Sequence, residues 1–352
     1  MQRVDAGLSV SGTARSRSAS IRDVARIAGV SHQTVSRVIN RHAKVSPATR
    51  ERVQKVIDEL GFRPNASARA LANGDTQSVT VLMSDTTRYG YLATLTGIEE
   101  AARAASFSVG IVVIESGSSS HVRAAIENAI DTGGALVVVA FDKTGQLALR
   151  EVPERIPMAA AVESPASAPP AGAPWCWIDD EAAARDATRY LLELGHPTVH
   201  YVALPSTTRS SRRTAGWRSA LRRAGIDPPT PLQADWGALS GHEAGVFLSR
   251  DPGVSAILCG NDEIALGVLS ALHAERRKIP GDVSVAGFDD EPQSAFYTPA
   301  LTTTKLDFVA LGRSCFATVT ARLGGEHVEP HPVGTPELVV RASTGSPRRA
   351  RS

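Results

Sequence analysis

The stretch IRDVARIAGVSHQTVSRVIN, residues 21–40, contains two short helical patterns separated by one glycine. In the first pattern the apolar residues Val24, Ile27 and Ala28 recur at helical spacing, which predicts that they form the buried face of a helix. Gly29 follows directly and is expected to end that helix, because glycine adopts the left-handed conformation of a C-cap without strain. The segment therefore predicts a helix, a tight turn and a second helix.

The second helix is expected to begin after Ser31, whose hydroxyl can cap it. Its inner face is predicted to be Val35, Val38 and Ile39, which leaves polar side chains on the outer face. Those polar side chains are His32, Gln33, Ser36 and Arg37.

A third helix is predicted to follow, with Ser46 as N-cap, Pro47 in the first turn and Gly61 at its end. Two short helices around a glycine turn, braced by a third, form a helix-turn-helix domain, whose second helix lies in the DNA major groove. Gln33 can then pair with adenine and Arg37 with guanine. The alternative is that this face is only the solvated side of a small helical domain.

The charge of the chain is unevenly distributed. Residues 1–75 carry 13 Lys/Arg and 6 Asp/Glu, a net +7, whereas the remainder carries 25 basic and 30 acidic residues, a net −5. A basic head on a mildly acidic body favours contact between the head and a polyanion. A solvated basic face without a partner is the simpler alternative.

Composition narrows the class of protein further. The 352-residue chain is long enough for two or three domains. It contains no run of about 18 apolar residues to span a membrane, and residues 1–19 read as a disordered basic tail rather than a secretory signal. Cys176, Cys259 and Cys315 lack disulfide or metal-ligand spacing, which favours the cytoplasm and a buried apolar role for each.

The segment FRPNASARALA, residues 62–72, follows the predicted head. Pro64 interrupts the chain, and Asn65 can cap a short helix rich in small residues. A helix this short is not expected to hold alone, since about 12 residues are needed for marginal stability. It is predicted either to fold against DNA and a partner subunit or to be a plain linker.

From residue 77 onward, strand-like apolar runs alternate with helical patterns. This alternation predicts parallel sheets with helices on both faces, and the length predicts two α/β subdomains. The Pro/Ala-rich residues 163–174 are expected to form a surface loop.

The core carries no recognisable catalytic signature. A P-loop, a G-x-G-x-x-G after a strand, a G-x-S-x-G elbow and H-E-x-x-H are all missing from the sequence. Asp289 and Asp290 are adjacent at a strand end and are expected to point in opposite directions, which argues against a catalytic dyad. The protein is therefore expected not to be an enzyme, and no cofactor or metal is predicted.

Polar residues gather instead at the predicted strand ends of the core. They are Arg213, Asn261, Asp262 and Asp289, with Trp236 nearby. Ligands of open α/β folds bind outside the carboxyl ends of strands, and an indole with Asp, Asn and Arg suits a hydroxyl-rich molecule. The alternatives are core packing for Trp236, a loop cap for Asp289 and a turn residue for Asn261.

The segments IRDVARIAGVSHQTVSRVIN and VSPATRERVQKVIDELGFRPNASARALA resemble the DNA-binding head of the LacI family of bacterial transcription regulators. The resemblance implies that NASARALA is a hinge helix that pairs with its copy in the minor groove of a palindromic operator, with Leu71 as the intercalating wedge. The DNA-binding residues that it implies are Ser31, His32, Gln33, Thr34, Ser36, Arg37, Asn40, Asn65, Ala68 and Leu71.

The resemblance continues through RRTAGW, CGNDEIALGVL, VSVAGFDD and YTPALTTTKLDF, and covers roughly residues 20–345. It implies a periplasmic-binding-protein-like core of type I that binds a small effector, favouring a sugar over a purine. The effector-binding residues that it implies are Arg88, Tyr91, Thr94, Arg213, Trp236, Asn261, Asp289 and Phe308. Val162 departs from the aspartate of a sugar-responsive member, and Arg88 and Tyr91 replace smaller apolar groups, so the effector need not be a galactoside.

The resemblance also fixes the expected domains. These are a tail at 1–19, a helix-turn-helix domain at 20–64, a hinge at 65–76, a core at 77–345 and a tail at 346–352. The N-subdomain is expected at about 77–177 plus 306–334, and the C-subdomain at about 178–305 plus 335–345. No long heptad-patterned helix follows the core, so a homodimer is expected rather than a tetramer.

The sequence thus predicts a cytoplasmic, dimeric regulator, more plausibly a repressor, that a small carbohydrate releases from operator DNA. One rival keeps the DNA role but makes the ligand a nucleobase or corepressor that tightens binding. The other rivals are a solute-binding protein for uptake and an α/β enzyme with a regulatory head.

Overall fold

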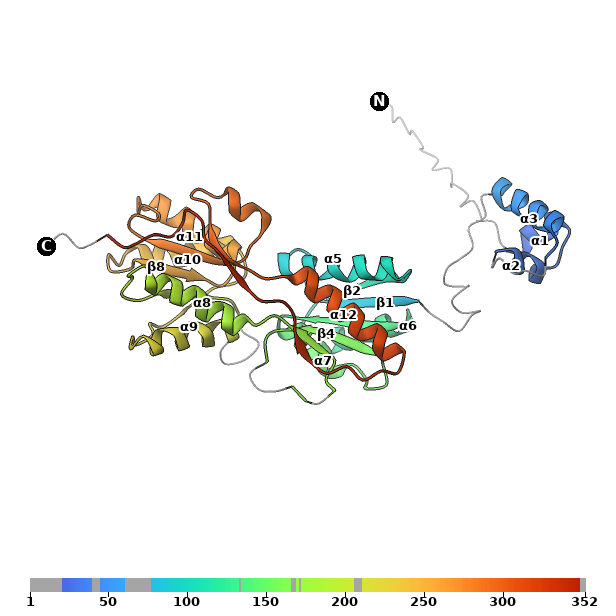
Figure 1. The fold of residues 1–352 in the computed structure, drawn as a ribbon, viewed down its shortest axis with the longest axis horizontal. Coiled ribbons are helices and arrows are strands. Elements are labelled where there is room, and N and C mark those ends of the chain that lie inside the picture. The colour runs from blue at the N-terminus through green and yellow to red at the C-terminus, as the bar shows by residue number, and fades with distance from the viewer. Residues whose placement is uncertain are drawn as a thin grey trace, which may run out of the picture. The chain divides into compact units, whose positions relative to one another are not determined.

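The computed structural model describes residues 21–39, 45–60, 77–132, 134–165, 169–170, 172–205 and 211–348. The chain divides into two units, a head within residues 1–76 and a core within residues 77–352 (Figure 1). The predictions for the N-terminal tail, the hinge, Asn40, Asn65, Ala68, Leu71 and residues 349–352 concern positions outside the described residues. The disordered C-terminal tail was predicted to begin at 346, but residues 346–348 are described and Arg348 pairs with Asp282 at 3.0 Å.

The head consists of α1 (Ile21–Ala28), α2 (His32–Ile39) and α3 (Pro47–Glu59). The predicted end of α1 and start of α3 are confirmed: Gly29 has φ +63°, and the hydroxyl of Ser46, the residue before Pro47, accepts a hydrogen bond from the Thr49 amide. Gly61, the predicted end of the third helix, lies outside the described residues. The three helices share an apolar core. Its buried members are Val24, Ala25, Ala28, Val35, Val38, Val53 and Val56.

One assignment within α1 is wrong. Ile27 was expected to be buried, but 47% of its surface is exposed, and Ala25 lies in the core instead with 7% exposed. The buried face of α1 passes through Val24, Ala25 and Ala28, which are three and four residues apart. Ile27 lies beside that face, and none of the three described helices of the head covers it.

The core contains two six-stranded sheets, each built mainly of parallel strands, which confirms the predicted fold class. The first sheet has the order β11-β5-β4-β3-β1-β2, and its pairings are all parallel. Its strands are β1 (Ser78–Met83), β2 (Ser108–Val113), β3 (Ala135–Ala140), β4 (Met158–Val162), β5 (Trp175–Trp177) and β11 (His331–Pro332).

The second sheet has the order β12-β10-β9-β8-β6-β7, in which only the β10–β12 pairing is antiparallel among the described strands. Its strands are β6 (His200–Ala203), β7 (Leu232–Gln233), β8 (Ala256–Cys259), β9 (Ser284–Asp289), β10 (Thr302–Lys305) and β12 (Glu337–Val339). We call the sheets and their helices the N-subdomain and the C-subdomain. The chain passes between them after β5, after β10 and after β11.

Helices cover both faces of each sheet, as strands with alternating buried sides require. In the N-subdomain, α5 and α12 cover one face and α6 and α7 the other; in the C-subdomain, α8 and α9 cover one face and α10 and α11 the other. The helices are α5 (Tyr89–Ala104), α6 (Ser119–Asp131), α7 (Lys143–Glu151), α8 (Asp180–Glu193), α9 (Arg212–Arg223), α10 (Ala238–Ser249), α11 (Asp262–Ala274) and α12 (Phe308–Leu323), with a short 3-10 helix η1 (Pro292–Phe296) before β10.

Glycines permit the close packing of two helix pairs. A Cβ at Gly97 of α5 would lie 2.0 Å from the Val309 carbonyl oxygen, and one at Gly312 of α12 would lie 2.0 Å from the Thr94 carbonyl oxygen. The pair α10 and α11 repeats the arrangement with Gly241 and Gly267. Both contacts are backbone against backbone, so neither position has room for a side chain.

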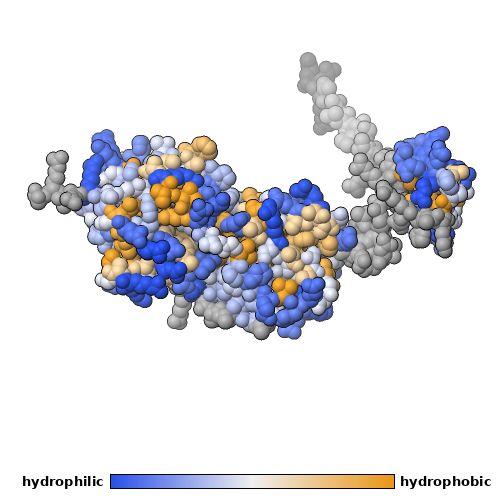
Figure 2. Space-filling model, viewed as in Figure 1, coloured by the Kyte–Doolittle hydropathy of each residue, from blue (hydrophilic) through white to orange (hydrophobic). Residues whose placement is uncertain are grey.

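The core surface is mixed in polarity, with apolar patches among hydrophilic side chains on the face shown in Figure 2. Leu92 of α5 and Ile111 and Val113 of the edge strand β2 are exposed by 42%, 50% and 43%. Among the described helices, none has the length and apolar character needed to cross a bilayer.

Candidate functional site

The polar face of α2 is open in the structure. Ser31, His32, Gln33 and Arg37 are exposed, and Thr34 and Ser36 are partly exposed. The Ser31 hydroxyl accepts a hydrogen bond from the Thr34 amide at 3.2 Å and thereby fixes the start of the helix. Val35 and Val38 anchor the opposite face in the core of the head, so α2 presents a row of hydrogen-bonding groups on a rigid support.

A cleft opens between the N-subdomain and the C-subdomain of the core, with about 800 Å³ of space between its walls, the open mouth included. It lies where strands of both sheets end, as open α/β folds favour. The predicted residues that line it are Arg88, Tyr91, Arg213, Trp236, Asn261, Asp289 and Phe308.

The N-subdomain wall of this cleft is aromatic. Tyr91 packs edge-on against Phe141 with ring centroids 5.2 Å apart, and Phe308 lies 5.9 Å from Phe141 and 6.2 Å from Tyr89. Gly90 lets the Phe308 ring approach, because a Cβ there would lie 3.1 Å from it. The hydroxyl of Tyr91 accepts a hydrogen bond from Ser84 at 3.2 Å, which orients the ring.

Arg213 is the centre of the C-subdomain wall. Its Nε donates to Asp180 at 2.8 Å, its Nη2 donates to Asp289 at 3.2 Å, and its Nη1 donates to the Gly260 carbonyl. The guanidinium also lies 4.7 Å from the centre of the Phe288 ring. Burial lowers the pKa of Arg213, but the two carboxylates outweigh it and raise the pKa above the ordinary value.

Asp289 ends β9 with a backbone φ of +102°, a conformation that is strained for a residue with a side chain. Its carboxylate lies at the cleft beside Arg213. One oxygen accepts from Arg213, and the other has no hydrogen-bond partner among the described residues. Burial raises the pKa of Asp289, against the lowering effect of Arg213. Asp290 turns away and pairs with Arg341 at 2.6 Å, which is the divergence expected from the sequence.

Asn261 serves the fold as well as the cleft. Its Oδ1 accepts from the Ile264 amide at 2.8 Å and caps α11, and its Nδ2 donates to the Trp236 carbonyl at 2.9 Å. One amide hydrogen therefore remains for a ligand. Trp236 is only partly buried, and the same hydrogen bond fixes the backbone from which its indole extends.

Arg88 crosses the cleft from the N-subdomain. Its guanidinium carbon lies 4.4 Å from the centre of the Trp236 ring in the C-subdomain. Its Nε is 3.2 Å from Asp85, so the same side chain contacts a carboxylate on its own wall and an indole on the opposite wall.

Several lining residues were missed by sequence reasoning, namely Tyr89, Phe141, Asp180 and Glu291. Asp180 follows β5 in WIDD, so the strand-end rule contained a signal for it. Glu291 is 7% exposed, and burial together with Asp289, Asp262 and Glu263 raises its pKa to about 8.

Two predicted polar residues do not line the cleft. The Thr94 side chain is fully buried and donates to the Gly90 carbonyl at 2.7 Å, because its turn of α5 packs against α12 at Gly312. Asp262 is also fully buried and accepts hydrogen bonds from the Glu291 amide and from the hydroxyls of Ser294 and Thr303. It supports the loop after β9 rather than facing a ligand.

Glu291 gives the core a pH-dependent stability. Its pKa in the folded chain is about 8 against an ordinary 4.5, so the folded state holds the proton more tightly than the unfolded state does. Its contribution is therefore fully present below pH 4.5 and is lost as the pH rises through 8. Relative to Glu291→Gln, the native chain should lose a few kcal/mol in its free energy of unfolding between about pH 5 and 9, as measured by denaturant titrations.

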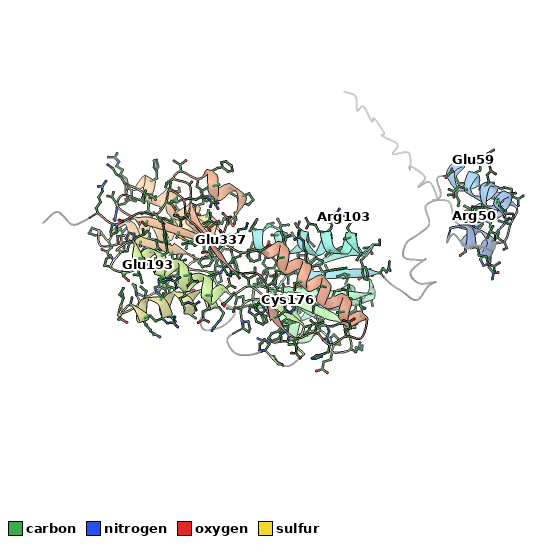
Figure 3. The ribbon with its side chains drawn as sticks, viewed as in Figure 1. Arg50, Glu59, Arg103, Cys176, Glu193 and Glu337 are labelled. Carbon is green, nitrogen blue, oxygen red and sulfur yellow. The ribbon has the colours of Figure 1, made fainter. Side chains whose placement is uncertain are left out.

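The matched control for this pH series is Glu193→Gln on the exposed surface of α8 (Figure 3). That change should leave the pH dependence of the native chain unaltered. Equal slopes for the native chain and Glu291→Gln would contradict the assignment of Glu291 as a buried carboxyl that is neutral at mildly acidic pH.

Among the described residues, no group of three or more His, Cys, Asp or Glu side chains has the arrangement of a metal site. The three cysteines are free and buried. The cleft thus presents one aromatic wall and one wall of carboxylate, amide and guanidinium groups.

Two family models match the chain. One, described as bacterial regulatory proteins of the lacI family, covers residues 20–65, and the other, a periplasmic binding protein-like domain, covers residues 188–344. The lactose operon repressor of Escherichia coli K12 is 30% identical over 332 residues, which span 92% of this chain and 90% of that protein. The transcriptional repressor PurR of Vibrio parahaemolyticus is 29% identical over 344 residues, which span 92% and 98%.

The fold comparison agrees with the sequence comparison. A crystal structure of the lac repressor dimer bound to operator and the anti-inducer ONPF superposes with a TM-score of 0.84 at 28% identity, over 94% of this chain and 100% of that chain.

Proposed function

The chain belongs to the lacI family of bacterial regulatory proteins, which makes it a DNA-binding transcriptional regulator, and we propose that a small carbohydrate bound in the core cleft controls its operator binding. It acts as a repressor in the cytoplasm, and the cleft binds its ligand without turnover. These assignments rest on the similarity to repressors and on the residues of the cleft.

The proposal that the ligand is a carbohydrate rests on one observation. The aromatic wall of the cleft faces a polar wall. A sugar ring has apolar C–H faces and equatorial hydroxyls, so it needs an aromatic surface together with fixed acceptors and donors. The open oxygen of Asp289 supplies an acceptor, and the remaining amide hydrogen of Asn261 supplies a donor. Trp236 supplies the stacking surface.

Titration calorimetry of the full chain tests the ligand class. The panel contains lactose, cellobiose and ribose against adenine, guanine and hypoxanthine. A sugar should bind, and Asp289→Asn should weaken it by about 1–3 kcal/mol, because the acceptor is lost beside the buried Arg213. If only a purine binds, the ligand is a nucleobase and not a carbohydrate. The panel includes purines because the chain is similar to PurR.

The regulatory step is a shift between two arrangements of the core. The chain crosses between the subdomains three times, so ligand contacts made to both walls favour one relative orientation. In a dimer that orientation sets the spacing of the two heads and the pairing of the hinge segments around Leu71. The effector changes operator affinity only as far as it binds the two arrangements differently.

Dimerisation is proposed on the same basis. Exposed apolar side chains of α5 and the edge strand β2, Leu92, Ile111 and Val113, form a surface suited to a second copy. A two-fold dimer places two heads on the halves of a pseudo-palindromic operator. Sedimentation of the native chain should show a dimer, and Ile111→Glu should shift it towards monomer.

Base reading by α2 is proposed for the exposed Gln33 and Arg37. Arg37→Ala should cost about 1–3 kcal/mol on the preferred operator and relax selectivity at one base pair, because a bidentate contact to guanine is lost. Selection from a randomised operator library, followed by binding titrations at fixed salt, measures both effects.

The control for Arg37 is Arg26→Ala, which removes an equally charged and exposed side chain from α1. It should leave base preference unchanged. If Arg37→Ala weakens all sequences equally, Arg37 contacts only phosphate.

A further inference from the structure

The sugar-stacking surface proposed above is covered by a side chain of the protein itself. The guanidinium carbon of Arg88 lies 4.4 Å from the centre of the Trp236 ring, which is the distance of a stacked cation–π contact. Arg88 precedes α5 in the N-subdomain, whereas Trp236 precedes α10 in the C-subdomain. The contact therefore joins the two walls of the cleft.

Arg88 is held in this position from its own side. Its Nε lies 3.2 Å from Asp85, and the other carboxylate oxygen of Asp85 accepts from the amides of Thr87 and Arg88 and from the Thr87 hydroxyl. Burial raises the pKa of Asp85, but these hydrogen bonds and Arg88 outweigh it and lower the pKa, so the carboxylate stays charged at neutral pH. Asp85 thus anchors the guanidinium without a requirement for a ligand.

A ring cannot stack on an indole face that a guanidinium covers. We infer that Arg88 is an internal occupant of the Trp236 platform, and that the effector must displace it to bind. This inference rests on the proposed carbohydrate site. Arg88 therefore sets the affinity and selectivity of the site for its ligand. Only a ligand whose stacking and hydrogen bonds are more favourable in free energy than the Arg88–Trp236 contact can displace Arg88 from the indole.

The inference also gives Arg88 a part in coupling. The Arg88–Trp236 contact favours the arrangement in which the two walls are close, and a ligand that displaces Arg88 replaces that contact with its own. The released guanidinium remains beside Asp85 at the rim of the cleft. Arg88 is thus a positioning residue that acts on the ligand through Trp236.

Fluorescence quenching by acrylamide tests the occupancy directly. The Trp236 signal is obtained as the difference between each protein and its Trp236→Phe version, which removes the signals of Trp175, Trp177 and Trp217. In the ligand-free full chain, Arg88→Ala should increase quenching of Trp236, and Arg88→Lys should give an intermediate value, since an ammonium lacks the flat guanidinium.

The matched control is Arg103→Ala, on the outer surface of α5, where Arg103 pairs with Glu99 (Figure 3). It removes an arginine from the helix that Arg88 precedes and should leave Trp236 quenching unchanged. Equal quenching of Trp236 in the native chain and in folded Arg88→Ala would overturn the inference.

Calorimetry with lactose and cellobiose tests displacement. Arg88→Ala should bind a sugar about 2- to 30-fold more tightly than the native chain, the factor that corresponds to a cation–π contact of about 0.5–2 kcal/mol. Weaker binding by Arg88→Ala would show that Arg88 donates to the ligand and would overturn the competition. If neither sugar binds any variant while quenching rises in Arg88→Ala, the occupancy holds and the carbohydrate proposal fails.

Discussion

Replacement of Arg213 by leucine should destabilise the core by about 3–5 kcal/mol, because it leaves buried carboxylates without their counter-ion. The Arg213 side chain is 12% exposed, and its partners Asp180 and Asp289 are 13% and 11% exposed. The Gly260 carbonyl would lose its hydrogen bond as well. Denaturant titration of the full chain, followed by circular dichroism, measures the loss in the free energy of unfolding.

The neighbouring change Arg212→Leu is the control. Arg212 pairs with Glu181, and both side chains are more exposed than those of the Arg213 network, at 24% and 30%, so its loss should cost less than the loss of Arg213. Combining Arg213→Leu with Asp289→Asn should recover part of the stability, since one buried charge is removed with its partner. Equal losses for Arg212→Leu and Arg213→Leu would show that the Arg213 network contributes no more than the less buried Arg212–Glu181 pair.

In the head, the sequence predicted those helix ends that are determined by a single residue type. Gly29 ends α1 with a positive φ, and Ser46 with Pro47 begins α3, because these residue types satisfy the free groups at helix ends. The pattern failed for Ile27, since hydrophobic spacing defines a helix face only to within one neighbouring position. Which neighbour is buried depends on the other helices.

The strand-end rule predicted part of the cleft for a similar reason. Asn261 follows β8 and Asp289 ends β9, so the topology of a parallel sheet alone brings them to one edge. Phe141 follows β3 and Glu291 follows β9 as well, but a position after a strand does not by itself separate a lining residue from an ordinary loop residue. The contact between Arg88 and Trp236 depends on how two subdomains meet, which no local pattern determines.

Thr94 shows a limit of transferring positions by resemblance. It lies one turn into α5 from Tyr91, so either the cleft or the α12 interface was compatible with its place in the sequence. The structure assigns it to the interface, because the glycine at position 312 lets α12 approach the Thr94 backbone. The helix crossing, not the sequence of α5, decides which side chains reach the cleft.

Gly312→Ala should strongly destabilise the core, because Gly312 lies where α12 crosses α5. A Cβ at this position would lie 2.0 Å from the Thr94 carbonyl oxygen and 2.9 Å from the Ile98 amide nitrogen, so the two helices must separate. Overpacking of this kind costs about 1–3 kcal/mol or more. At a helical glycine with free space around it, substitution by alanine would instead stabilise the fold by about 1 kcal/mol. The sign of the stability change therefore tests the crossing itself.

The ligand site should respond along with stability. Phe308 begins α12 and Tyr89 begins α5, so separation of the helices moves the aromatic wall apart and weakens effector binding in calorimetry. Gly97→Ala meets the Val309 carbonyl from the other helix and should act in the same direction. Gly110→Ala in β2 is the control, because its nearest contact would be the Thr80 hydroxyl at 3.5 Å. Stabilisation by Gly312→Ala would mean that α5 and α12 do not pack backbone to backbone, and that other contacts hold Phe308 over the cleft.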